Sequence, residues 1–214
     1  MYLILGILII LFAYSRMRRK NLEKQVELFN RLLYKEKSPQ KYIDEVDKLL
    51  LKVQSERETS INYIQKTTGL LYAGRFEEVV DILNNRVKKI PSNWQAVYYH
   101  NLLLSMYFNG DVEKANQSMV QARETLDLYG KKDYSTVTIK LTYAVSDFYN
   151  GNFSECREFF MDLIDISKND YRVAFGCYFM GKILEAENKT DDAQVYFEKA
   201  KTYGQGSFME DFQR

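Results

Sequence analysis

Proline, glycine, cysteine and histidine are all scarce in this chain. Its 214 residues include 2 prolines, 10 glycines, 2 cysteines and 1 histidine. So few turn-forming residues argue against a loop-rich β protein and favour a mostly helical one. Because His100 is the only histidine, dyads with a second histidine and multi-histidine metal sites are excluded, and no histidine-based catalytic triad is expected.

Other catalytic and cofactor signals are also missing. The glycines occur one at a time, so no glycine-rich phosphate loop exists. Cys156 and Cys177 lack metal-ligand spacing and fall at core-facing helical positions, where we expect inert packing. The acid pairs Glu77–Glu78 and Asp191–Asp192 fall in first turns of helices, where they complement the helix dipole. We therefore predict no enzyme activity, no cofactor, no metal and no small-molecule substrate.

Charge is balanced overall but unevenly placed. The formal net charge is +1, which argues against a strongly basic nucleic-acid binder. Residues 15–57 carry 12 Lys or Arg and 7 Asp or Glu, a net of +5, whereas residues 58–214 carry a net of −4. Binding to a nucleic-acid backbone needs clustered positive charge, so we expect no nucleic-acid partner for the acidic part.

An apolar run opens the chain. Tyr2–Tyr14 contains no charged residue, and Arg16, Arg18, Arg19 and Lys20 follow directly. A secretory signal has its charge before the apolar core, so this order predicts an uncleaved anchor in residues 1–20. The basic flank predicts a single-pass membrane protein with the rest of the chain on the cytoplasmic side, beside anionic headgroups.

The run is short for this role, and two alternatives remain. A comfortable crossing needs about 20 apolar residues, although basic side chains can snorkel and the bilayer can thin. A buried core helix or a helix lying on the membrane surface would also be apolar. The run has no polar face, which favours the anchor over an interfacial helix.

Residues 21–57 are expected to form a membrane-proximal helical hairpin. Apolar residues recur at helical spacing across 21–36, and Ser38 with Pro39 marks the start of a second helix. A coiled coil is the alternative, but Pro39 interrupts any long heptad run. The hairpin therefore precedes the main body of the chain.

A recurring turn organises residues 58–203. In Tyr72–Val79 a helix end, Gly74 and a new helix start follow one another, and the pattern recurs around Gly110, Gly151 and Asn188. Both residue types tolerate a left-handed helix end. Spacings of 36, 41 and 37 residues indicate stacked helix pairs, an α-solenoid. Expected helices cover 58–73, 77–89, 94–108, 112–128, 135–149, 153–167, 170–187 and 190–203. The tail, 204–214, shows no periodicity and is expected to fray.

These units resemble tetratricopeptide repeats (TPRs), which are helix-turn-helix repeats of about 34 residues. Small residues occupy the positions at which the family's paired helices come close. These are Ala144 and Gly181 before the turn and Ala115, Cys156 and Ala193 after it. Four positions after Ala115, Cys156 and Ala193 stand the large apolar residues Met119, Phe160 and Phe197. Thr67 and Leu103 depart from the pattern, and Pro91 alone matches the closing proline. The resemblance implies an all-α fold of four TPR-like repeats over 58–203.

The resemblance also implies a binding surface on the concave face, formed by the first helix of each pair. Mixed aromatic and polar side chains there suit an extended peptide or a partner helix. Packing between repeats is the alternative role for each of them. The candidate partner-binding residues are His100, Asn101, Tyr107, Thr138, Thr142, Tyr178, Lys182 and Glu185.

Three functions fit this sequence. The first is a membrane-anchored scaffold or adaptor that holds a protein or peptide partner at the membrane, where tethering raises its effective concentration. The second is a regulator that senses a peptide through a change of solenoid curvature. The third is a stably incorporated subunit of a larger membrane complex.

Overall fold

The computed structural model describes residues 2–211, except for the side chains of residues 2–11, 13, 14 and 18. The described residues form ten α-helices, two short helical turns and no strand, which confirms the all-α class. The bounds are α1 (Tyr2–Asn30), π-helical η1 (Arg31–Lys35), α2 (Pro39–Leu50), α3 (Glu56–Tyr72), α4 (Phe76–Asn85), 3-10 turn η2 (Ser92–Trp94), α5 (Gln95–Phe108), α6 (Val112–Gly130), α7 (Thr136–Tyr149), α8 (Phe153–Ile166), α9 (Asp170–Ala186) and α10 (Thr190–Tyr203).

Each predicted turn residue ends a helix in the left-handed region. The φ angles are 73° at Gly74, 81° at Gly110, 79° at Gly151 and 62° at Asn188. In the first turn the N–H of Arg75 donates to the carbonyl of Leu70 at 2.9 Å, and equivalent bonds recur in the other three. This pairing satisfies carbonyls that a helix end would otherwise leave unpaired. The helix-turn-helix units are therefore confirmed locally.

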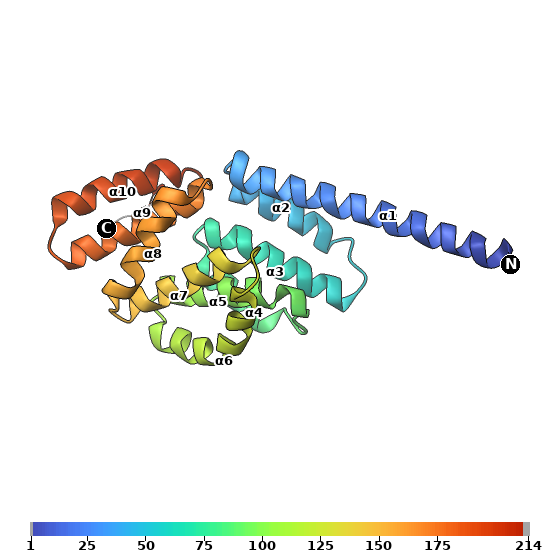
Figure 1. Ribbon diagram of the computed structural model, residues 1–214, viewed down its shortest axis with the longest axis horizontal. Coiled ribbons are helices and arrows are strands. Elements are labelled where there is room, and N and C mark those ends of the chain that lie inside the picture. Colours follow the sequence, from blue (N-terminus) through green and yellow to red (C-terminus); the bar gives the residue numbers. More distant parts are fainter. Residues whose placement is uncertain (1, 212–214) are drawn as a thin grey trace.

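The helices pack mainly on their neighbours in sequence. Each first helix packs against its second helix, in the pairs α3–α4, α5–α6, α7–α8 and α9–α10. The second helices of the first three pairs also contact the first helix of the next pair, and α3, α5 and α7 contact one another in succession. One large buried cluster runs through these layers, from Ile43 to Met209. The path curves so that α9 and α10 return beside the N-terminal hairpin (Figure 1).

Helix α1 runs without a break across residue 20, the expected end of the anchor. It extends away from the body at the N-terminal side (Figure 1). Among the helices described, none combines the length and apolarity needed to cross a membrane. Pro39 begins α2 as predicted, with Ser38 before it, although the Ser38 side chain makes no capping hydrogen bond.

The C-terminal tail is packed rather than frayed as far as residue 211, so that expectation was wrong there. Met209 is fully buried, and the N–H of Phe208 donates to the carbonyl of Tyr72 at 2.8 Å. The Phe208 ring lies 5.1 Å from the rings of both Phe76 and Phe108. The tail thus adds to the core at the end of α3, a contact that no local pattern signals.

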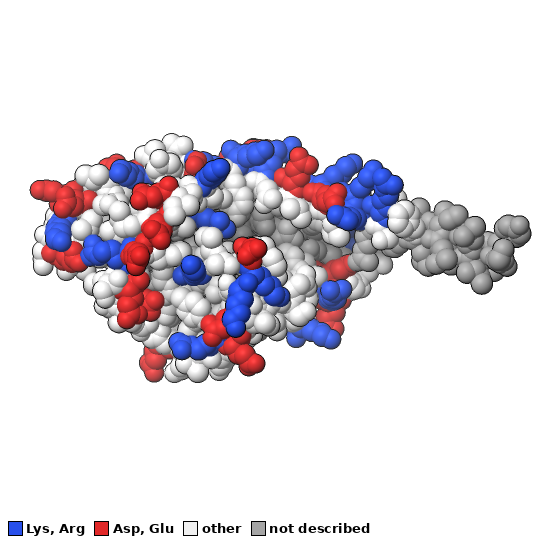
Figure 2. Space-filling view, viewed as in Figure 1, with Lys and Arg blue, Asp and Glu red and all other residues white. Residues whose placement is uncertain are grey.

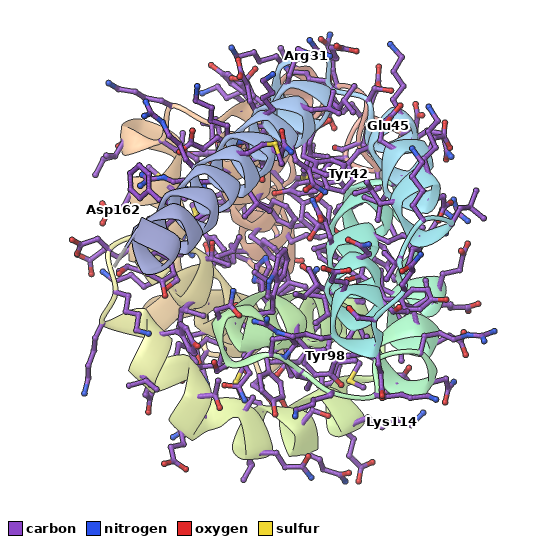
Figure 3. All side chains as sticks on the ribbon, turned by 90° about the vertical axis from the view of Figure 1, so that its right-hand side faces the viewer. Arg31, Tyr42, Glu45, Tyr98, Lys114 and Asp162 are labelled. Atoms are coloured by element: carbon purple, nitrogen blue, oxygen red, sulfur yellow. The ribbon has the colours of Figure 1, made fainter. Side chains whose placement is uncertain are left out.

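The first and last parts of the fold meet at a contact that we call the seam. It comprises the η1–α2 connection, the end of α3, the start of α9 and tail residues 204–211. Tyr171 of α9 stacks on Tyr72 of α3 at 4.7 Å and belongs to the buried cluster of the N-terminal hairpin. The Lys37 ammonium lies 2.8 Å from the Asp170 carboxylate. Viewed from the α1 end, the helices surround a centre filled with side chains (Figure 3).

Candidate functional site

An open hollow of about 700 Å³, which we call the cleft, lies next to the seam. It is bounded by η1, the start of α7, the end of α8 and the start of α9. In Figure 2 the surface is hollowed below α1, with basic side chains along its edge. The cleft is lined by Tyr34, Lys35, Thr136, Val137, Lys140, Phe159, Asp162, Leu163, Ile166 and residues 167–172.

The α8–α9 connection sets the direction in which α9 enters the cleft. Ser167 leaves α8 in an extended conformation, and its Oγ accepts a hydrogen bond from the Asn169 N–H at 3.2 Å. Asn169 caps α9, since its Oδ1 accepts from the Arg172 N–H at 3.1 Å. A side-chain cap satisfies a donor of the first helical turn and fixes where the helix begins. Tyr171 and Arg172 are thereby placed at the cleft.

One wall of the cleft is apolar. Leu163 is buried, whereas Phe159 and Val137 are partly exposed to the hollow. Ile166, at the end of α8, is 75% exposed and extends the apolar wall to the rim. A partner side chain placed against this wall would remove apolar surface from water, which is favourable by about 25 cal/mol per Å².

The charged residues of the cleft are mostly cations without acidic partners. Lys35, Lys140 and Lys168 are exposed. Within residues 2–211, no carboxylate lies within 4.0 Å of these three ammonium groups or of the Arg172 guanidinium. Of the two acids that line the cleft, Asp170 is paired with Lys37, which leaves Asp162. The cleft is therefore positive.

Arg172 also acts on the interior behind the cleft. Burial, and to a smaller extent the positive charge of Arg172, lowers the pKa of His100 to about 4. Burial raises the pKa of Tyr34, and Arg172 opposes that shift. His100 is consequently neutral at neutral pH. Arg172 is the cation whose charge acts on both His100 and Tyr34.

Three tyrosines form the boundary between the cleft and the seam. Tyr34 lies edge-on to Tyr72 and to Tyr171, each at 6.2 Å between ring centroids. The Tyr171 hydroxyl donates to the carbonyl of Gln205 in the tail at 3.2 Å. The tail therefore supports the same aromatic group that lines the cleft.

The predicted partner-binding residues separate into several places. His100, Thr138 and Thr142 meet in one chain of hydrogen bonds between α5 and α7. The Thr142 hydroxyl donates to the Thr138 carbonyl at 2.9 Å, and His100 Nδ1 lies 2.8 Å from the Thr142 oxygen. Because the only hydroxyl proton is already donated, we assign the proton to Nδ1 of His100. This group joins α5 to α7.

Asn101 and Tyr107 are buried and fully engaged within the protein. The amide of Asn101 donates to the hydroxyls of Thr67 and Thr68, each at 3.0 Å. The Tyr107 hydroxyl donates to Asn116 at 2.7 Å, and its ring stacks on a neighbouring tyrosine. Both residues thus contribute to contacts between helices in this structure.

The remaining three candidates lie on α9. Tyr178 packs among aromatic rings that include Phe108 and Phe208. Lys182 pairs with Glu185 at 2.9 Å, and both side chains are partly exposed. The structure does not bring these residues together with the His100 group into one continuous exposed surface.

The basic flank of the expected anchor lies on α1. Arg16, Arg19 and Lys20 are exposed, and the Arg19 guanidinium lies 3.0 Å from the Glu23 carboxylate. The side chain of Arg18 is outside the described part of the chain. Among the described side chains of this flank, Arg16 and Lys20 have no carboxylate within 4.0 Å, so these two cations are available for a polar or anionic environment.

Metal-ligand clusters and reactive thiols can be examined in the described residues. In that part of the chain, no group of three or more His, Cys, Asp or Glu side chains could hold a metal ion. Cys156 and Cys177 are buried free thiols, and burial raises the pKa of each to about 11. Both are therefore protonated at neutral pH and are poor nucleophiles.

The cleft was not predicted from the sequence. Lys35 and Lys140 are separated by more than a hundred positions, and each looks like an ordinary exposed lysine of an amphipathic helix. The one available signal was Arg172, a cation near the start of α9, which is the first helix of the last pair. Only the return of α9 to η1 shows that these residues share one hollow.

Comparison with protein-family models, with curated proteins and with solved structures found no match for this chain.

Proposed function

We propose that this protein is a membrane-anchored scaffold or adaptor whose TPR-like helical solenoid binds a protein or peptide partner on the cytoplasmic side. The observation that carries the proposal is the combination of four helix-turn-helix units with an open, positively charged cleft beside them. The proposal assigns no catalytic or nucleic-acid-binding role to the chain. Its action would be to hold a partner near membrane machinery.

The solenoid part of the proposal rests on repeated geometry. The four left-handed turns share the same hydrogen bonds, and successive helix pairs bury a common core. Such stacking is typical of repeat proteins, which use extended surfaces for binding. The seam adds a contact between the two ends of the stack, which would hold its curvature in one state.

The anchor part rests on sequence alone. The uncharged run Tyr2–Tyr14 followed by basic residues favours insertion, and snorkelling lysine and arginine side chains would compensate for its short length. If full-length protein stays in the soluble fraction after lysis without detergent, the anchor is wrong.

A comparison of two chains tests the whole proposal. Full-length protein and a chain that begins at Gln25 are each purified in mild detergent with whatever they bind. Partners held by both chains belong to the helical body, and partners lost with residues 1–24 belong to the membrane segment. Failure of the full-length chain to hold any stoichiometric partner would contradict the adaptor role.

A stable subunit of a larger membrane complex is the second candidate. It is favoured by the exposed apolar residues Leu22 and Val26, which are 54% and 58% exposed on α1. They border a second hollow between α1, the end of α2 and the start of α3. A partner that remains at fixed stoichiometry through several purification steps would support this candidate over a transient adaptor.

A further inference from the structure

The cleft joins positive charge to an apolar wall, and its occupant can be inferred from that chemistry. Lys35 comes from η1, Lys140 from α7 and Lys168 from the α8–α9 connection, so the cations come from three separate elements that line the hollow. All three are exposed and lack a carboxylate within ion-pair distance among the described residues. A ligand that brings several separated negative charges would therefore match the rim.

One wall of the cleft has a different character. Phe159, Val137 and Leu163 line it, and Ile166 continues this surface outward. Asp162 also lies on α8, so a compact polyanion placed against this wall would meet a carboxylate as well as an apolar surface. A ligand that places apolar groups on this wall and its negative charges on the lysines reduces that repulsion.

We propose that the cleft binds a short acidic peptide segment of a partner protein, with apolar side chains against α8 and its carboxylates on Lys35, Lys140 and Lys168. The inference rests on the proposed adaptor function and identifies the class of segment that the adaptor recognises. Arg172, which lines the cleft together with Tyr34 and Tyr171, adds positive potential to the site.

An acidic peptide fits better than a single phosphate group because the cations come from three separate elements. Complementary charge raises the association rate and selects among partners, while the buried apolar contact supplies affinity. Binding should therefore weaken as salt rises, since exposed charges are screened over about 8 Å at physiological ionic strength.

The test uses full-length protein in mild detergent and fluorescence anisotropy. The probe is a fluorescein-labelled peptide in which Asp and Glu alternate with Leu and Phe. A matched peptide has Asn and Gln in place of the acids. Wild-type protein should bind the acidic peptide about tenfold or more tightly than the neutral one. If wild-type protein binds neither peptide, or both equally, the proposal is overturned.

Charge reversal locates the site. Lys140→Glu with Lys168→Glu should weaken binding of the acidic peptide about tenfold or more, because two attractive contacts become repulsive. The matched control, Lys88→Glu with Lys89→Glu, makes the same charge change on exposed residues after α4 and should alter binding less than about twofold. Equal weakening by both variants would indicate general charge attraction and overturn the proposal.

The apolar contact is tested separately with Ile166→Gln. This residue is 75% exposed, so the change should leave folding intact while binding weakens about threefold to tenfold. Unchanged binding in this variant and in the charge-reversed variant would overturn the proposal. Circular dichroism melting curves of all variants show whether a loss of peptide binding is caused by unfolding.

Three further outcomes distinguish this inference from the adaptor function itself or from a lipid site. A stoichiometric partner that remains on the Lys140→Glu, Lys168→Glu variant, with no peptide binding in wild type, would leave the adaptor intact and overturn the cleft. If short-chain phosphatidylserine binds wild type but not that variant, and the peptides do not bind, the cleft is a lipid site and the proposal is overturned. Cleft-dependent peptide binding without a stable partner would support the site and count against the adaptor.

Discussion

The seam and the cleft lie side by side on α9, yet they differ in composition and in how completely they are filled. At the seam, Tyr171 stacks on Tyr72, and Phe208 of the tail packs on Phe175, whose ring also contacts Tyr72. In the cleft the same helix start faces a hollow of about 700 Å³ bordered by lysines. One contact closes the fold, and the other leaves exposed a surface suited to a partner.

The difference follows from which part of the chain reaches each place. The tail turns back after α10, and Gly206 lies so close to the Lys37 carbonyl that a Cβ there would be 1.9 Å from the oxygen. This close approach brings Phe208 and Met209 onto the end of α3. No described segment covers Phe159 and Ile166 in the same way. Stability should therefore depend on the seam and binding on the cleft.

The largest effect on stability is expected from Phe208→Ala at the seam. Removing this ring should lower the free energy of unfolding by about 3 kcal/mol, because it leaves a void among Phe76, Phe108 and Phe175. Urea denaturation followed by circular dichroism measures the change. Tyr134→Ala, at a position 74% exposed, is the control and should alter stability by less than about 0.5 kcal/mol. Similar small losses in both variants would show that the tail does not stabilise the fold.

The pH dependence of stability tests the burial of His100 and the influence of Arg172 on it. The pKa of His100 falls from 6.5 in the unfolded chain to about 4 in the fold. As pH falls between these values, the unfolded state takes up a proton that the folded state does not, so stability is lost on acidification. We expect about 2 kcal/mol less stability from this group, below the value for the full shift because the ring is partly exposed.

The control for this pH effect is His100→Asn, which keeps an N–H donor toward Thr142 and does not titrate. Its unfolding free energy should fall less than that of wild type over the same pH range. Arg172→Gln should raise the pKa of His100 in NMR titration, because a cation that disfavours imidazolium is removed. Parallel curves for wild type and His100→Asn would rule out the histidine as the source.

Gly74 and Gly110 separate backbone strain from contact with the tail. Both have positive φ, so alanine at either should be destabilising by about 1 kcal/mol. A Cβ on Gly74 would also lie 2.8 Å from the Phe208 Cβ, whereas nothing lies within 4 Å at Gly110. Gly74→Ala should therefore be about 1 kcal/mol more destabilising than Gly110→Ala. That excess should disappear when both glycine variants are compared in a Phe208→Gly background, which lacks the Cβ atom at position 208.

The ion pair at the seam should contribute less. Lys37→Met removes the 2.8 Å contact with Asp170 and should lower stability by about 0.5 to 1 kcal/mol in low salt. Lys114→Met removes a more exposed pair with Asp111 and should have a smaller effect. The two losses should converge as salt rises. A larger loss in the Lys114 variant would contradict the importance assigned to the seam.

The smallest stability change is expected in the cleft. Lys140→Glu with Lys168→Glu breaks no ion pair of the described residues, so the unfolding free energy should change by less than about 0.5 kcal/mol. Thermal melting measures this on the same samples used for peptide binding. Marked destabilisation would mean that these lysines stabilise the fold, and the contrast between cleft and seam would be lost.

Local sequence signals predicted most of the helices. The turn residues Gly74, Gly110, Gly151 and Asn188 were identified because a left-handed helix end favours glycine or asparagine. Helix bounds in 135–149 and 153–167 agree with the structure to within one residue, since apolar periodicity and a nearby turn act over a few positions.

The candidate site was predicted less well for the opposite reason. Asn101 and Tyr107 lie on α5 as expected, but hydrogen bonds to Thr67 of α3 and to Ser146 of α7 engage them in the interior. Which face of a helix stays exposed to solvent depends on residues far away in sequence. The polar side chain of Asn101 therefore does not indicate whether this residue is exposed. Lys35, Lys140 and Arg172 carried no local signal as a group.

The sequence by itself determined the helices, their turns and the distribution of charge, because each depends on contacts within a few residues. The tertiary structure decided that the stack curves until α9 meets η1, that the tail packs at the seam, and that a positive hollow remains beside it. Those features join Tyr34 to Tyr171 and Tyr72 to Phe208 across more than a hundred residues. Long-range packing alone sets such distances, and with them the surface that we propose binds a partner.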